Sequence, residues 1–336
     1  SDVYKRQAWT RWRATHDLDG APDRSHDILP AVGAALPADF LGLDSQRLAG
    51  LRRKNWARNQ FLLRSLGDAL TLLAANHLPA IVIKGAVLVS EVYAEPGIRR
   101  MVDTDFVVGP DHLDRAVELL TGSGWTMKSE WFHAADLLDG NGNGIDVHRW
   151  PMFPRFTRTP EPGWGDRSVE VVIADTPTRR LALPDELVLT VTHGLFASPN
   201  RPSNVRWPLD LAAIRESETD AGFWSAVAHS AKEVGVAPVV GAGLGFCREE
   251  LGLDVPSEVV EELQAAEWDR WLAYQWWSRR HDRYPPLRIR RYVDLERAGD
   301  RRPTVKGYVA GRWENLRHHG VANVARHRIR NLRSLG

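Results

Sequence analysis

Cysteine and long apolar runs are scarce in this chain of 336 residues. The single cysteine, Cys247, excludes an internal disulfide framework and a zinc site built from several cysteines. Because it lies in an apolar, glycine-rich run, we expect a buried and inert thiol. No stretch approaches the ~20 apolar residues of a membrane helix, and the chain does not open with a signal-peptide pattern. A soluble cytoplasmic protein without membrane contact is therefore expected.

Net charge is also nearly absent, at +1 for the whole chain. This balance hides a segregation, because residues 279–336 contain 16 Lys and Arg against 5 Asp and Glu, a net +11, which leaves −10 on residues 1–278. Such a basic tail indicates either an anionic partner or an intramolecular one. No RRM, KH or zinc motif accompanies the tail, so nucleic-acid binding is the less favoured interpretation.

Periodicity divides the chain into three parts, and the expected fold class is α+β. Residues 1–44 predict poorly, and the first seven, SDVYKRQ, resemble a translated sequencing adapter. Residues 45–180 are expected to form a mixed-sheet domain that begins with a helix. Residues 181–336 are expected to form an all-helical domain that ends in the basic tail.

The expected elements follow from apolar spacing and from turn residues. The first helix covers residues 45–77, and its apolar residues, among them Trp56 and Phe61, recur near a 3.6 period. Its basic residues are expected on a solvated face: Arg52, Arg53, Lys54, Arg58 and Arg64. Strands are expected at 80–84, 101–108, 125–131, 133–138 and 145–150, with an edge strand at 169–173. Helices are expected at 86–93 and at 111–120, the latter capped by Asp111. In the C-terminal domain, helices are expected at 185–196, 205–216, 223–234, 239–251 and 257–277.

Residues 81–108 organise the first domain. A short apolar strand ends in Lys84-Gly85, and a second apolar run contains Asp103 and Asp105. Because strand side chains alternate, these two carboxylates are expected to share one face, where they repel each other. A bound divalent cation relieves that repulsion, and hard oxygen ligands suit magnesium. The alternative is structural, since Asp-x-Asp often caps backbone amides in turns and at helix starts.

A third carboxylate strengthens the metal interpretation. Asp146 follows the turn 141–144 in a strand of alternating apolar residues. If this strand lies beside the strand at 101–108, the three carboxylates meet. Three carboxylates can hold two magnesium ions, one activating a hydroxyl and one carrying a triphosphate.

As an ordered set, these residues resemble the DNA polymerase β-type nucleotidyltransferase superfamily. Within it, the chain resembles an uncharacterised bacterial group of nucleotidyltransferase family proteins that carries Lys-Gly where other branches carry Gly-Ser. The resemblance spans about residues 45–225 and rests on Lys84-Gly85, Tyr93, Gly97, Arg99, Asp103, Asp105, Asp146, His148, Pro184-Asp185-Glu186-Leu187, His193, Arg206-Trp207 and Asp210-Leu211.

The resemblance implies magnesium-dependent transfer of a nucleotidyl group from a nucleoside triphosphate to a hydroxyl or phosphate of a small-molecule or peptide acceptor. Asp103, Asp105 and Asp146 would be the catalytic metal ligands for two ions, and Asp146 would also help to deprotonate the acceptor. Gly85 would allow close approach of the backbone, and Lys84 would contact the triphosphate.

Several residues keep two interpretations. Arg99 either binds phosphate or neutralises the carboxylate cluster through a salt bridge. His148 either belongs to the site, as a donor to a carboxylate or a substrate contact, or is a satisfied strand histidine; we favour the site. His193 and Asp210 are expected in packing or interhelix hydrogen bonding, and Trp207 in the core.

Other functions stay open at the level of sequence. The chain could be a nucleotide-binding, antitoxin-like module, for which Arg312 and His318 show the spacing of a partner nuclease motif, or a retired catalytic fold. The basic tail could make an RNA end the acceptor. No residue specifies the donor base, or whether a nucleotidyl group or another phosphoryl group is transferred.

Overall fold

A computed structural model describes residues 2–21, 25–152, 157, 163–196, 206–269 and 272–273. Several predictions lie outside these residues: the start of the helix expected from 205, the end of the helix expected to 277, and the basic tail with Arg312 and His318.

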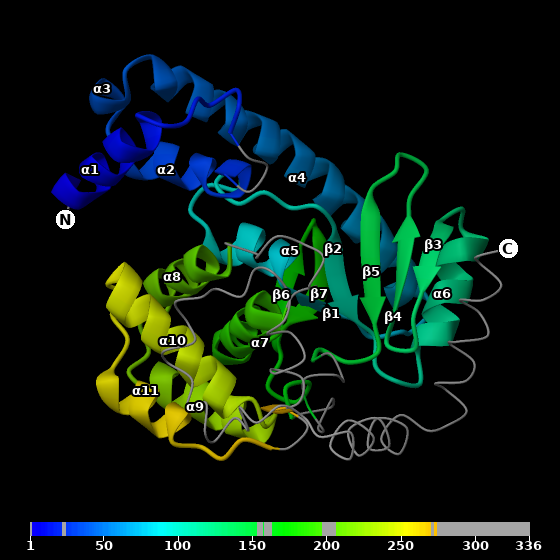
Figure 1. The fold of residues 1–336 in the computed structure, drawn as a ribbon. Helices are drawn as coiled ribbons and strands as arrows, with labels where there is room; N and C mark the ends of the chain where they lie inside the picture. The colour runs from blue at the N-terminus through cyan, green and yellow to red at the C-terminus, as the bar shows by residue number, and fades with distance from the viewer. Residues whose placement is uncertain are drawn as a thin grey trace, which may run out of the picture.

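A seven-stranded sheet forms the centre of the molecule (Figure 1), in the order β3-β4-β5-β2-β1-β7-β6. Strands β2 and β5 pair in parallel, as do β1 and β7, and the other neighbours are antiparallel. The predicted mixed sheet is thus confirmed, with β6 at its edge as expected. The strands are β1 Ile81–Ile83, β2 Thr104–Val107, β3 Thr126–Glu130, β4 Ala134–Leu138, β5 Gly144–His148, β6 Val169–Ile173 and β7 Thr176–Arg180.

Helices α4 (Leu43–Ala75) and α6 (Leu113–Gly122) cover one face of the sheet. Their apolar side chains form one core cluster with alternate strand residues, among them Val82, Phe106 and Val147. Short helix α5 (Gly85–Val87) and the π-helical turn η2 (Leu88–Val92) follow β1 and add to this cluster. We call this the α4 face.

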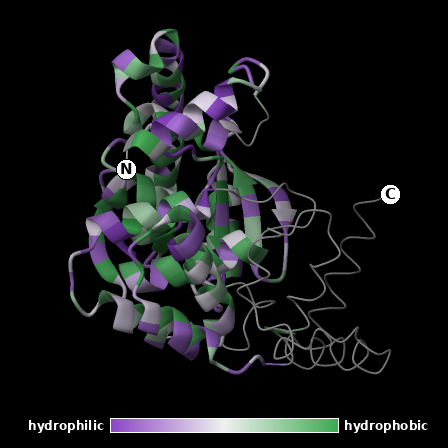
Figure 2. Ribbon diagram, turned by 60° about the vertical axis from the view of Figure 1, so that its left-hand side comes forward, coloured by the Kyte–Doolittle hydropathy of each residue, from purple (hydrophilic) through white to green (hydrophobic). Residues whose placement is uncertain are grey.

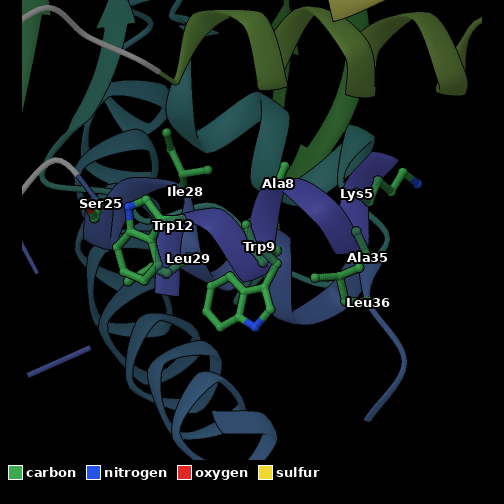
Figure 3. A pocket seen from close by; sticks show the side chains of 10 residues that line it. Lys5, Ala8, Trp9, Trp12, Ser25, Ile28, Leu29, Ala35 and Leu36 are labelled. Atoms are coloured by element: carbon green, nitrogen blue, oxygen red, sulfur yellow. The ribbon is translucent and has the colours of Figure 1, made fainter. Parts of the chain in front are cut away.

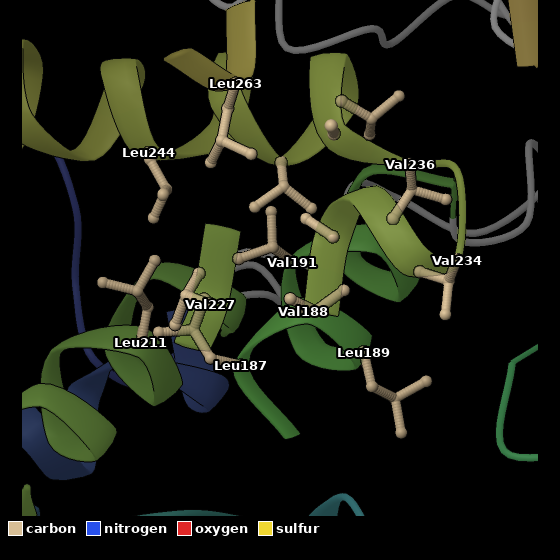
Figure 4. Packing of buried hydrophobic residues seen from close by; sticks show 14 of the residues in the cluster. Leu187, Val188, Leu189, Val191, Leu211, Val227, Val234, Val236, Leu244 and Leu263 are labelled. Carbon is tan, nitrogen blue, oxygen red and sulfur yellow. The ribbon is translucent and has the colours of Figure 1, made fainter. Parts of the chain in front are cut away.

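The opposite face meets the C-terminal helices α7–α11 (Figure 1). Ile83 and Val107 pack there with apolar side chains of these helices, including Leu187 and Val191 of α7 and Val227 of α9 (Figure 4). We call this the α7 face. Its helices are α7 Leu183–Phe196, α8 Trp207–Ser217, α9 Phe223–Glu233, α10 Ala237–Leu251 and α11 Ser257–Gln264.

The N-terminal segment is more regular than its sequence indicates. It contains α1 (Asp2–Arg13), the 3-10 turn η1 (Ser25–Asp27), α2 (Leu29–Ala35) and α3 (Ala38–Leu41). Helices α1, α2 and α3 share a small core with the start of α4. Side chains of α1, η1 and α2 also line an apolar pocket of about 410 Å³ (Figure 3).

Four details differ from the sequence predictions. Helix α6 begins at Leu113 after His112, so Asp111 is not its N-cap. Helix α11 ends at Gln264, because residues 265–269 leave the helical path. Strand β2 begins at Thr104, three residues later than expected. Trp56 and Phe61 of α4 are exposed, although their spacing indicated core positions. The reason is that α4 turns Asn55 and Asn59 inward, where they bind the loop before β2.

Other predictions are confirmed. Trp207 and the thiol of Cys247 are buried, and burial raises the pKa of Cys247 to about 12. Arg53, Lys54, Arg58 and Arg64 are exposed on α4, as a solvated face requires. Figure 2 shows hydrophobic residues gathered between the layers and hydrophilic residues on the outer turns. Among the described residues, none of the helices has both the length and the apolar character to cross a lipid bilayer.

Candidate active site

Three aspartates lie in one row across neighbouring strands. The pairing register places Asp136 of β4 opposite Asp146 of β5, and Asp146 opposite Asp105 of β2. Their strand neighbours Val147 and Phe106 pack on the α4 face, so alternation directs the three carboxylates to the α7 face. The site therefore lies between the sheet and the C-terminal helices.

Asp103 lies beside this row, two residues before Asp105 in the chain. It directly precedes β2, and its Cβ lies 3.7 Å from the position that a Cβ on Gly144 would occupy. Its charge helps to raise the pKa of both Asp146 and Lys84. The structure thus brings the three predicted carboxylates into one electrostatic cluster.

Asp105, Asp146 and His148 can each offer a ligand atom to one ion, because these atoms lie within 4.8 Å of one another. The Nε2 atom of His148 is 2.9 Å from Oδ1 of Asp105. Burial lowers the pKa of His148, and the charge of Lys84 lowers it further. A neutral imidazole beside two carboxylates suits a divalent cation.

The charges of the cluster are poorly balanced. Burial raises the pKa of Asp146 to about 9, and the charges of Asp105, Asp103 and Asp136 contribute. Burial also acts to raise the pKa of Asp105, but Lys84 and His148 hold it well below its usual range. Excess negative charge at Asp146 is what a divalent cation relieves. Carboxylate oxygens are ligands that suit magnesium, so the aspartates of this cluster fit that ion.

Lys84 is a cation in direct contact with this cluster. Its Nζ lies 2.6 Å from Oδ1 of Asp105. Burial acts to lower the pKa of Lys84, but the neighbouring carboxylates, led by Asp105, raise it. The residue has a φ of 56°, an uncommon conformation for a side chain other than glycine. Lys84 stands directly before Gly85, where helix α5 begins.

Helix α7 closes the site from the other side. Glu186 is fully buried in its first turn, and Oε1 accepts a hydrogen bond of 2.9 Å from the backbone N–H of Lys84. Burial raises the pKa of Glu186 to about 8. Two turns further on, burial lowers the pKa of His193 to about 3, with a contribution from the charge of Lys84.

Arg99 binds Asp210 of α8 through two parallel hydrogen bonds. Nε lies 2.7 Å from Oδ1 of Asp210 and Nη2 lies 3.0 Å from Oδ2. The hydroxyl of Tyr93 also donates to Oδ1, at 2.8 Å. The remaining Nη1 faces Gly85, where an added Cβ would lie 2.9 Å from it. Asp210 is thus a hydrogen-bonding residue, as expected, and its partner Arg99 lies against the Lys84-Gly85 turn.

Helix α4 fixes the loop that carries Arg99. The side chain of Asn59 donates to the carbonyls of Pro96 and Arg99 and accepts from the N–H of Met101. The loop lies so close to α4 that a Cβ on Gly97 would meet the carbonyl oxygen of Arg52 at 2.4 Å. Gly97 is therefore required by close packing.

Sequence reasoning missed Asp136 and the contact of Glu186. The place of Asp136 could be predicted from the sequence, because a hairpin centred on Asn141 pairs residue 136 with residue 146. Glu186 was part of the ordered set, but nothing local connects it with Lys84, which lies 102 positions away. The role of Asn59 could not be predicted, because no local pattern distinguishes it from the other polar residues of α4.

The described residues form a mixed sheet that aligns aspartates across neighbouring strands, with helices before and after it in the sequence, as expected for an α+β nucleotidyltransferase. The chain belongs to the family described as uncharacterised nucleotidyltransferases, whose model matches residues 24–252. The resemblance to nucleotidyltransferases is thereby confirmed at the level of the superfamily, and the Lys-Gly group within it stays a prediction. No curated protein matches the sequence.

Two solved structures resemble parts of the fold. One is the lincosamide antibiotic adenylyltransferase LnuA bound to lincomycin, with 15% identity, a TM-score of 0.32, and coverage of 44% of this chain and 93% of that one. The other is an antigenic nucleotidyltransferase-like protein from Paracoccidioides brasiliensis, with 15% identity, a TM-score of 0.32, and coverage of 51% and 88%.

Proposed function

We propose that the protein uses magnesium to transfer a nucleotidyl group from a nucleoside triphosphate to a hydroxyl or phosphate of a small-molecule or peptide acceptor. One observation carries the proposal: Asp105 and Asp146 pair directly in parallel strands, with His148 close enough to share an ion. Family membership supplies the class of reaction.

Asp105 and Asp146 would hold the metal together with Asp103, and the cluster has enough carboxylates for two ions. Magnesium, when bound there, would offset phosphate charge and make an acceptor oxygen easier to deprotonate. His148 donates a hydrogen bond from Nε2 to the carboxylate of Asp105, so it would orient that carboxylate for its role as a ligand.

In the proposed reaction the acceptor oxygen attacks the α-phosphorus, the bond to the bridging oxygen of the β-phosphate breaks, and pyrophosphate leaves with the bond electrons. When the acceptor is a hydroxyl, its proton would pass to the carboxylate of Asp146. When a nucleotide binds, the amine of Lys84 would leave Asp105 and contact the triphosphate. There it would offset the negative charge that builds on the leaving pyrophosphate. Gly85 would let the phosphates approach the backbone.

The test is isothermal titration of ATP, GTP, CTP and UTP with magnesium, for the wild type and for the double variant Asp103→Asn, Asp105→Asn. The matched control is Asp111→Asn, Asp68→Asn, which neutralises two exposed aspartates. We expect magnesium-dependent binding that the first variant loses and the control keeps, and the preferred base identifies the donor. Equal binding by the wild type and the first variant, or no binding, would contradict the proposal.

A further inference from the structure

We infer that Glu186 is a positioning residue for the nucleotide site, because it fixes the backbone of Lys84 so that the lysine amine faces the aspartate row. The inference rests on the proposed function where its effect on nucleotide binding is concerned. Its geometric part, the placement of the amine, can be tested without any nucleotide.

The direction of the Lys84 side chain is unusual for its place in the chain. Val82 packs on the α4 face and Ile83 on the α7 face. Regular alternation would return Lys84 to the α4 face, away from the aspartates. Instead its Nζ lies 2.6 Å from Asp105. The φ of 56° at Lys84 breaks the alternation, and this break brings the amine to the site.

A positive φ is unfavourable for a long side chain, so surrounding contacts must maintain it. Lys84 lies just beyond β1, whose paired residues are Ile81 to Ile83. Its N–H donates to Oε1 of Glu186 at 2.9 Å. Because a buried N–H needs a partner, this carboxylate favours the turned backbone over the regular one.

The burial of Glu186 does not by itself stabilise the fold. The side chain is fully buried, and Oε2 has no hydrogen-bond partner among the residues that the structure describes. A buried carboxylate with one unpaired oxygen is destabilising relative to an apolar side chain. The contact with Lys84 is the feature of the site that an apolar residue could not reproduce.

The first experiment compares Glu186→Met, which removes the acceptor oxygen, with Glu186→Gln, which keeps one. Acetylation of Lys84 by an amine-specific ester is followed by mass spectrometry, with the exposed Lys54 as internal reference. An amine released from Asp105 should react about tenfold faster, since one charge-assisted contact is lost. We expect faster acetylation in Glu186→Met and an unchanged rate in Glu186→Gln. An unchanged rate in both variants would overturn the inference.

The second experiment measures affinity for the preferred nucleotide with magnesium in a cycle with Lys84→Met. If Glu186 acts through Lys84, Glu186→Met weakens binding about tenfold in the wild type and has no further effect in Lys84→Met. Equal weakening in both backgrounds would show a merely structural role and overturn the inference. Circular dichroism confirms that each variant is folded.

The two experiments separate the two proposals. Faster acetylation of Lys84 in Glu186→Met, with no nucleotide binding by the wild type, supports the positioning role and contradicts the proposed function. Metal-dependent nucleotide binding by the wild type, with acetylation unchanged in Glu186→Met, supports the proposed function and contradicts the positioning role.

Discussion

Lys84 and Asp105 form an ion pair at the atoms that the proposed function assigns to metal. Both side chains are largely buried, with 17% and 10% of their surface exposed. Because the ammonium and a cation compete for one carboxylate, we expect Lys84→Met to bind Mn²⁺ more tightly in the absence of nucleotide. A hydrogen bond to a charged group contributes about 1.5–3 kcal/mol, so the gain should be roughly 10- to 100-fold. Titration followed by electron paramagnetic resonance measures it.

The matched control is Lys128→Met, which removes an exposed lysine on β3. It should leave Mn²⁺ affinity at the wild-type value. If Lys84→Met also binds Mn²⁺ with unchanged or lower affinity, Lys84 does not compete with metal at Asp105.

His193 should make the protein sensitive to acid. Burial lowers its pKa from about 6.5 to about 3 in the folded state, with a contribution from Lys84. The unfolded chain therefore binds more protons between these values, and stability falls as pH drops from 6.5 toward 3. The slope from one such group approaches about 1.4 kcal/mol per pH unit.

Urea unfolding at pH 5 and pH 7 tests this expectation. The loss of unfolding free energy on acidification should be smaller in His193→Gln than in the wild type. His229→Gln, at an exposed histidine of α9, should retain the full loss. A pH dependence that is the same in all three proteins would assign the acid sensitivity to other groups.

At the scale of residues, the sequence predicts which carboxylates lie together better than how they are arranged. The proximity of Asp103, Asp105 and Asp146 could be predicted because acidic residues are conspicuous in apolar segments, and their role as metal ligands stays a prediction. The approach of Lys84 to Asp105 could not, because it depends on a positive φ that no local pattern indicates for lysine. The exposure of Trp56 was missed for a related reason, since burial on α4 is decided by Asn59 and the loop it binds.

At the scale of elements, the pair Arg99–Asp210 fixes helix α8 to the loop before β2. Both side chains are nearly buried, with 11% and 5% exposed. Removing one partner leaves the other charge buried, so we expect Asp210→Leu to lower the free energy of unfolding by about 3–5 kcal/mol. Urea denaturation measures the change.

The double variant Arg99→Met, Asp210→Leu is the informative control. It removes both charges, and should recover much of the stability that Asp210→Leu loses. If the double variant has a lower free energy of unfolding than Asp210→Leu, the ion pair is not the contact that holds α8.

Element prediction failed where tertiary pairing, not local pattern, creates the structure. Strand β7 has the sequence Thr-Pro-Thr-Arg-Arg, which is polar and contains proline. It forms because β1 and β6 offer partners on both sides. The long helix α4 and the β4–β5 hairpin were predictable because apolar periodicity and the Asn-Gly turn are local signals.

At the scale of the whole molecule, the two large core clusters meet at the sheet. Ile83 and Val107 belong to the cluster built mainly by the C-terminal helices, and their strand neighbours Val82 and Phe106 belong to the α4 cluster. A domain boundary near residue 180 stays a prediction. Because strands of the one sheet contribute side chains to both clusters, we expect one cooperative unfolding transition.

Urea unfolding followed in parallel by far-ultraviolet circular dichroism and by tryptophan fluorescence tests this. The two probes should give coincident transitions. Trp164 and Trp207 belong to the helical cluster, so separate midpoints would show that the helices unfold independently of the sheet.

The row of Asp136, Asp146 and Asp105 has a thermal consequence. The backbone hydrogen bonds of β4, β5 and β2 set the spacing of these carboxylates, and side-chain rotation alone cannot spread them across the sheet. Warming therefore leaves the spacing of these carboxylates nearly constant until the strands separate. Inactivation by heat would then follow the loss of the sheet, without an earlier phase in which a folded protein has a loosened site.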